Sequence, residues 1–145
     1  MGFTRRCEIG LLLALISLGG CVTWSSDIPI DQLSSDAPKV LPVPRAWTHS
    51  ASKLELCVVV ESAYKQDVRS QSFVDSDGTT SEITVVGVHQ DQRAKLGSRF
   101  YLGQNLVCFV VANDRSGSPF SAIEVSSSPG SLKISRVYWH WGHYI

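Results

Sequence analysis

Aromatic and imidazole side chains gather near the C-terminus, over residues 138–144, in the order Tyr-Trp-His-Trp-Gly-His-Tyr. In an extended strand, successive side chains point to opposite faces, so Tyr138 and His140 would share one face and Trp139, Trp141 and His143 the other. Aromatic residues dominate binding hot spots. One interpretation makes the tryptophan face an exposed platform for a partner or a sugar, with all five residues as candidates for partner binding. The other makes the segment an edge strand whose indole rings cover the core of a small β domain, which needs large apolar side chains, while the imidazoles lie in solvent.

The histidines do not predict a metal site. His140 and His143 diverge on a strand, and a zinc ion needs three or four protein ligands. The segment 75–82 resembles the start of a calcium loop, but its glutamate comes too early for that loop, so we expect a solvated hairpin tip. The sequence holds no Gly-x-Ser-x-Gly motif, no glycine-rich phosphate loop and no Cys-x-x-Cys pair. We therefore expect no catalytic residue, no metal and no cofactor, and we predict that the chain is not an enzyme.

Charge argues against nucleic acid as a partner. The chain has 145 residues, with 13 basic and 13 acidic side chains and a formal net charge of zero. A domain that binds phosphate backbones normally carries a basic patch and a high pI. The length suits one domain, with no room for two ordinary cores.

The first twenty residues have the composition of an export signal. Arg5 and Arg6 form a basic start, and an apolar stretch follows over residues 9–18. This stretch of about ten residues is too short to cross a bilayer, which takes roughly twenty. We therefore expect residues 1–20 to be a signal peptide that is cleaved during export.

At the end of this segment, Leu18-Gly19-Gly20-Cys21 resembles the lipobox of bacterial lipoproteins, a leucine and two small residues before a cysteine. The resemblance implies a diacylglycerol on the sulfur of Cys21, cleavage before it, and acylation of the new amino group, for example by palmitate. Two or more acyl chains anchor a protein stably. Val22 stands where an aspartate would favour the inner membrane, so the resemblance implies an outer-membrane anchor and a periplasmic body. The alternative is an ordinary secreted protein that is cut at a Gly-Gly site.

Two thiols remain in the expected mature chain, Cys57 and Cys108, and each lies in a run rich in valine and leucine. An oxidising periplasm favours a disulfide between them. That bridge would close a loop of about 50 residues and contribute on the order of 4 kcal/mol in the chain-entropy model. The alternatives are two inert core thiols or a redox pair, although a redox pair usually shows the Cys-x-x-Cys spacing.

Residues 21–52 show no hydrophobic period and are rich in serine and proline, so we expect a lipidated, extended tether there. Trp24 could lie among lipid headgroups as an interfacial anchor, or it could be an incidental exposed aromatic residue. Trp47 is expected to pack onto the domain that follows. The tether would hold four of the six prolines, which are Pro29, Pro38, Pro42 and Pro44.

Residues 53–145 alternate with period two and are rich in β-branched residues, which predicts strands separated by turns. We expect an all-β domain of about seven antiparallel strands, either a small sandwich or a barrel. Only residues 91–96 could form a helical turn or two. The expected strands span residues 53–61, 71–74, 82–89, 99–102, 106–112, 120–125 and 132–141.

Two strands that each carry a cysteine, over residues 56–60 and 106–110, give the chain a looser resemblance to small periplasmic lipoproteins of the type VI secretion immunity class. This resemblance implies a periplasmic protein that binds and blocks a toxic effector delivered by a neighbouring cell. Two other hypotheses stay open. One is a structural lipoprotein of an envelope secretion or conjugation machine, and the other is a module that binds glycans or inhibits lysozyme.

Overall fold

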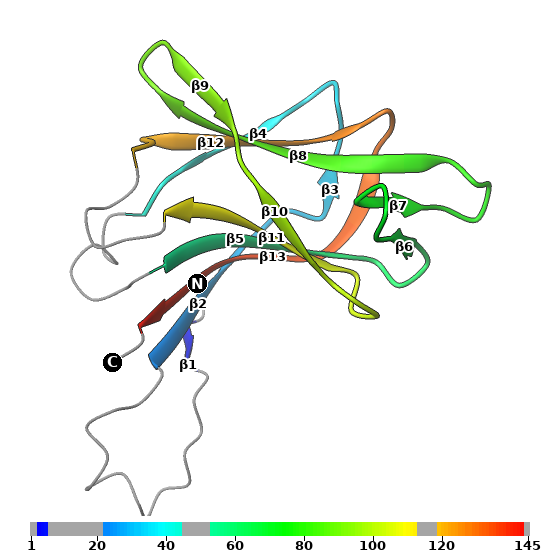
Figure 1. Cartoon of the computed structure of the whole chain (residues 1–145), viewed down its shortest axis with the longest axis horizontal. Helices are drawn as coiled ribbons and strands as arrows, with labels where there is room; N and C mark the ends of the chain where they lie inside the picture. The colour runs from blue at the N-terminus through cyan, green and yellow to red at the C-terminus, as the bar shows by residue number, and fades with distance from the viewer. Residues whose placement is uncertain (1–2, 6–21, 45–52, 113–118, 144–145) are drawn as a thin grey trace, which may run out of the picture.

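A computed structural model describes residues 3–5, 22–44, 53–112 and 119–143 of the chain (Figure 1). In these residues every regular element is a β-strand, and none forms a helix that could span a membrane. The strands are β1 (Phe3–Arg5), β2 (Val22–Ile28), β3 (Gln32–Leu33), β4 (Lys39–Pro42), β5 (Lys53–Val60), β6 (Lys65–Asp67), β7 (Ser72–Val74), β8 (Thr80–His89), β9 (Gln92–Lys95), β10 (Ser98–Tyr101), β11 (Leu106–Ala112), β12 (Ala122–Ser128) and β13 (Leu132–His143).

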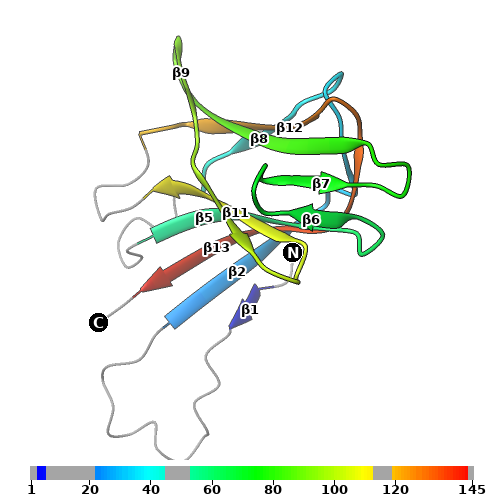
Figure 2. The same cartoon turned by 45° about the vertical axis from the view of Figure 1, so that its right-hand side comes forward.

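The strands form two antiparallel sheets that pack as a sandwich, which confirms the expected fold class (Figures 1 and 2). The first sheet has the order β1-β2-β13-β5-β11-β10, and β3 also pairs with β13. The second sheet has the order β4-β12-β8-β7-β6, and β9 also pairs with β8. Strands that follow one another in the chain often lie in different sheets, so most of the pairing is between residues far apart in sequence.

The core lies between the two sheets and follows from the period-two pattern of the long strands. Along β5, Leu54, Leu56 and Val58 point inward and are fully buried. Valines of β11 and β13 extend this inner face of the first sheet. The second sheet supplies the opposite wall of the core through Phe73, Ile83, Val85, Ile123 and Val125.

Residues 22–44 do not form the expected tether. They contain β2, β3 and β4, which pair with β13 and β12, and Leu33 is fully buried. The prolines that suggested a tether are compatible with these strands, because proline is tolerated at strand ends and sheet edges. Pro29 follows β2, and Pro42 ends the edge strand β4. Cys21, Trp47 and the rest of the segment 45–52 lie outside the described residues.

The expected strands of the β domain are all present, and the one over residues 106–112 has the predicted bounds. The suggested helical turn at residues 91–96 is wrong, because β9 runs through it and pairs with β8. After β9 the chain crosses between the sheets, where Leu96 N donates to Val85 O at 2.8 Å and Val110 N donates to Gly97 O at 3.3 Å. The strand count exceeds about seven because most of the additional strands are short, and among those of residues 22–44 only β2 has apolar residues at alternate positions.

Candidate functional site

The outer face of the first sheet, which points away from the core, collects charged and aromatic side chains around a disulfide. In the register of the sheet, Cys57 of β5 lies opposite Cys108 of β11 and Tyr138 of β13, while Glu55 lies opposite His140. Side chains directly opposite each other share one face of a sheet. We call this surface the disulfide face, and its members are Asp27, Lys53, Glu55, Cys57, Arg99, Tyr101, Cys108, Arg136, Tyr138 and His140.

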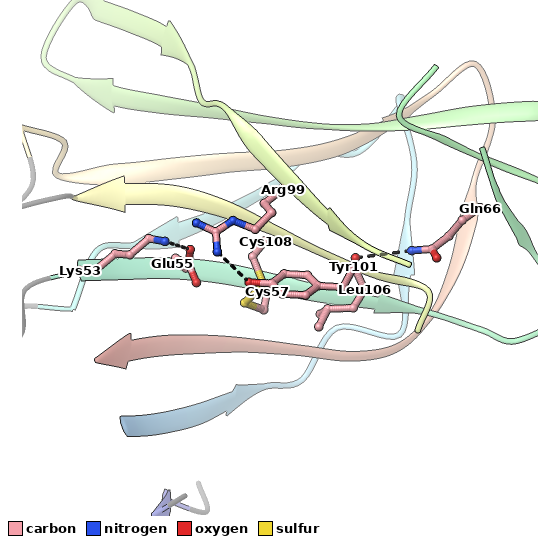
Figure 3. Close-up of a disulfide and its surroundings, with 8 residues drawn as sticks. All are labelled: Lys53, Glu55, Cys57, Gln66, Arg99, Tyr101, Leu106 and Cys108. Atoms are coloured by element: carbon pink, nitrogen blue, oxygen red, sulfur yellow. Dashed lines mark hydrogen bonds and ion pairs between the residues drawn. A yellow bond between two sulfur atoms is a disulfide. The ribbon is translucent and has the colours of Figure 1, made fainter. Parts of the chain in front are cut away.

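The disulfide between Cys57 and Cys108 is present, which confirms the pairing proposed from the sequence. Both cysteines are buried although they lie on an outer face. Figure 3 shows Arg99 and Tyr101 of β10 lying next to the bridge. A disulfide is consistent with an oxidising compartment.

Glu55 places a carboxylate beside the disulfide, but the three residues do not make a metal site. Ligand atoms of Glu55, Cys57 and Cys108 lie within 4.8 Å of one another, the only such group in the part of the chain that the structure describes. The two sulfur atoms are bonded to each other, so neither is a thiolate that could bind a metal ion. The group is therefore a structural one.

The Glu55 carboxylate is buried and paired with a lysine two residues earlier on the same strand. Lys53 Nζ lies 2.6 Å from Glu55 Oε1, and only 4% of Glu55 is exposed (Figure 3). A buried carboxylate is costly unless a cation or hydrogen-bond donor compensates it. Lys53 supplies that compensation, so the pair holds a fixed polar group in the middle of the disulfide face.

His140 lies opposite Glu55 and is half-buried on the same face. Burial lowers the pKa of His140 below its ordinary value, the Glu55 carboxylate opposes this shift, and the Lys53 ammonium adds to it. At neutral pH the imidazole is therefore uncharged and adds no cation to the face.

The lowered pKa of His140 predicts a pH-dependent stability. The unfolded chain binds a proton at His140 more readily than the folded chain does, so this histidine costs stability as the pH falls below about 6.5. Above that pH, His140 does not lower the stability. We expect His140→Gln to lose less thermal stability than the wild type between pH 7.5 and pH 5.5, as measured by Tm. An equal drop in Tm in the two proteins would show that protonation of His140 does not affect stability.

Two arginine–tyrosine pairs stand on the disulfide face. Arg136 Cζ lies 4.1 Å from the ring centroid of Tyr138, and Arg136 Nε donates to Asp27 Oδ1 at 2.5 Å. Arg99 Cζ lies 6.0 Å from the ring centroid of Tyr101, and its Nη1 donates to Tyr101 Oη at 3.5 Å (Figure 3). A guanidinium over an aromatic ring is held by electrostatic attraction to the ring face.

The register places these two pairs on either side of the bridge. Arg99 lies opposite Cys108, which lies opposite Cys57, which lies opposite Tyr138. Neighbouring strands are about 4.8 Å apart, so the two pairs are separated by roughly 14 Å. The disulfide thus forms the centre of a row that has an arginine–tyrosine pair at each end.

Four of the five residues singled out at the C-terminal end separate between the two faces of β13. Trp139 is buried in the core with 7% of its surface exposed, and Trp141 packs against the core while half-buried. Tyr138 and His140 lie on the disulfide face with their rings edge to face at 6.5 Å. His143 ends β13 opposite Val22, and its side chain lies outside the described part of the structure. The indole of Trp139 is therefore part of the core, as the second interpretation proposed. The rest of that interpretation is wrong, because β13 lies between β2 and β5 and is not an edge strand, and His140 is half-buried.

Sequence reasoning missed Asp27, Glu55, Arg99, Tyr101 and Arg136. One signal was available, because Glu55 interrupts an otherwise apolar run, Leu-Glu-Leu-Cys-Val-Val-Val. A charged residue in a strand buried on both sides needs a partner, and that need marks it as unusual. The arginines and Tyr101 carry no comparable signal, since only the strand register brings them together.

The acidic segment at residues 75–82 forms the expected turn between β7 and β8. Asp75 Oδ1 accepts hydrogen bonds from the backbone N of Asp77 and of Thr79, both at 2.9 Å. Gly78 adopts a φ of 82°, a left-handed conformation that glycine allows without strain. The carboxylate of Asp75 stabilises the turn itself.

Comparison with protein-family models, curated proteins and solved structures gives no match for this chain.

Proposed function

We propose that the protein is a lipid-anchored module of the bacterial cell envelope that binds a protein partner through the disulfide face. The observation that carries this proposal is the row formed by the disulfide and the two arginine–tyrosine pairs. Arginine and tyrosine are enriched among the residues that dominate protein interfaces. Here they stand on a sheet that a disulfide crosslinks, so little conformational entropy would be lost on binding.

Charge on the disulfide face indicates which partner it fits. Lys53 and Arg136 are paired with Glu55 and Asp27, whereas Arg99 is exposed and has no carboxylate within 4.0 Å among the described residues. A partner that presents a carboxylate could form a two-pronged ion pair with the Arg99 guanidinium. We therefore propose a protein partner with an acidic segment.

The polar groups of this face support binding rather than catalysis. Glu55 is buried and held by Lys53, so its carboxylate is not positioned to take a proton from a substrate. The cysteines are joined in a disulfide, so neither is a nucleophile. In a more specific form of the proposal, the partner is a toxic effector of a type VI secretion system, which this protein blocks in the periplasm.

The proposed anchor would lie close to the folded body. Cys21 is the residue immediately before β2, and β2 is paired with β13 in the first sheet. The sandwich would then sit at the membrane surface, without the tether of about 30 residues expected from the sequence. An interaction at this surface would be restricted to partners that come close to the membrane.

Expression of the full chain in a Gram-negative host, with fractionation and in-cell photo-crosslinking, tests the proposal. We expect the wild type in the membrane fraction and Cys21→Ala released from it. A photo-crosslinking amino acid in place of Tyr101, on the disulfide face, should give an adduct with one other protein. The matched control replaces Thr84, which is half-buried on the outer face of the second sheet, and should give no such adduct.

The outcomes separate the two halves of the proposal. Retention of Cys21→Ala in the membrane fraction contradicts the lipid anchor. Absence of an adduct at Tyr101, or the same adduct at Thr84, contradicts binding through the disulfide face. If the adduct protein is not toxic when it is exported to the periplasm without this chain, the immunity form of the proposal is wrong.

A further inference from the structure

The edge of the first sheet changes if the leader is removed. In the full chain the edge strand is β1, which pairs with β2 and consists of residues 3–5 of the expected signal peptide (Figures 1 and 2). Cleavage before Cys21 removes β1 and makes β2 the edge strand. The backbone N–H and C=O groups of β2 that face away from β13 then have no other strand of the described residues beside them.

As an edge, β2 lacks the features that normally prevent strands of different molecules from pairing. It spans seven residues, holds no proline and no basic residue, and has Asp27 as its one charged residue. Proteins usually protect long edges with lysine, proline or short strand length. The other edge strands of the described residues carry such protection. β3 is only two residues long, and the others have Lys39 and Pro42 of β4, Lys65 of β6, Arg93 and Lys95 of β9, and Arg99 of β10.

β1 shows how an added strand fits on this edge. It runs antiparallel to β2, with Phe3 opposite Ser26, Thr4 opposite Ser25 and Arg5 opposite Trp24. The centre of β2 therefore accepts an antiparallel neighbour without any change in the rest of the sheet. A two-fold axis between two copies of one strand produces the same antiparallel arrangement.

We propose that in the mature protein β2 pairs with β2 of a second copy of this chain, in place of the lost β1. The inference rests on the proposed function, in which the leader is cleaved before Cys21. With the axis at Ser25, the middle residue of β2, Asp27 of each copy would lie opposite Thr23 of the other, so no like charges meet across the strands. Asp27 is also neutralised within its own copy by Arg136. The paired first sheets form one continuous sheet, with the two disulfide faces on its outer side.

A cysteine trap in the full chain tests this arrangement in the cell. Ser25→Cys places a thiol at the centre of β2, whereas the two cysteines of the body are already joined and Cys21 is expected to carry lipid. We expect a covalent dimer of the processed chain on a non-reducing gel, which disappears on reduction. The control Ser126→Cys, on the outer face of the second sheet, should stay monomeric.

A second measurement does not depend on crosslinking. Sedimentation equilibrium of the detergent-extracted wild type, in density-matched detergent, should give the mass of two chains. Ser25→Lys would place two like charges opposite each other, and we expect association to weaken at least about tenfold, or about 1.4 kcal/mol. The control Ser126→Lys should remain a dimer.

Three results overturn the proposal: a wild type that is monomeric at every concentration, a dimer that Ser25→Lys leaves unchanged, or a Ser25→Cys adduct with a different protein. The last result would assign the edge to another protein. Failure of leader cleavage is seen separately, as an N-terminus of the extracted chain that does not begin at residue 21, and it contradicts the proposed function instead.

Discussion

Replacing Cys57 and Cys108 together by alanine should lower the free energy of unfolding by about 4 kcal/mol. The bridge joins residues 51 positions apart in sequence, and the chain-entropy model gives about 4 kcal/mol for a loop of this size. Small domains are only marginally stable, at roughly 5–15 kcal/mol. We therefore expect the double variant to be close to unfolding at 37 °C, with a large drop in Tm and in the urea midpoint.

Reduction of the wild type is the matched control for this prediction, because it breaks the bond but keeps both sulfur atoms in place. The reduced wild type should lose most of the stability that the double variant loses. A double variant within about 1 kcal/mol of the oxidised wild type would contradict the chain-entropy argument. A large loss in the variant but not on reduction would assign the effect to packing around the buried sulfurs.

The cysteine-bearing strands were predictable because local pattern and chemistry agree there. β11 is an uninterrupted β-branched and apolar run bounded by a Gly-Gln-Asn turn, and its bounds follow from the sequence. Cys57 and Cys108 were the two thiols left in the expected mature chain, so an oxidising compartment left them few alternatives to pairing with each other. Their direct cross-strand contact follows from the pairing of β5 with β11, which the sequence did not reveal.

The strands of residues 22–44 were not predictable because their signal lies in tertiary contacts. β2 reads Val-Thr-Trp-Ser-Ser-Asp-Ile, in which Val22, Trp24 and Ile28 stand at alternate positions, but Ser26 interrupts this short pattern. The strand forms because the long strand β13 offers an edge to it. β4 contains Pro42, which normally argues against a strand but is tolerated at this edge position. Sheet pairing outweighs local propensity in both cases.

For the candidate site, too, the sequence predicted local features of single strands but not the contacts between strands on the disulfide face. The alternation along β13 predicted that Tyr138 and His140 share a face and that Trp139 lies on the other, and the structure confirms this. The sequence could not show which face is the core. It also could not show that Arg99, some 40 residues earlier, lies in one row with Tyr138, since that row depends on the order of four strands.

Trp139 is expected to be a residue whose truncation damages the fold severely. It is 7% exposed and lies between Leu56 of β5 and Ser26 of β2 in the first sheet. Deleting a buried tryptophan side chain costs about 3–5 kcal/mol, since both the transfer free energy and the packing around the cavity are lost. We expect Trp139→Ala to be largely unfolded, and Trp139→Phe to stay folded with a lower urea midpoint.

Trp141 provides the matched control, because it is the next residue on the same face of β13 and is half-buried. Trp141→Ala should lose clearly less stability than Trp139→Ala, while Trp139→Phe should leave binding of the partner unchanged. If Trp139→Phe keeps the wild-type urea midpoint but weakens partner binding, the indole acts at a binding surface and its assignment to the core is wrong. Chemical denaturation and the Tyr101 photo-crosslink, measured on the same variants, separate these outcomes.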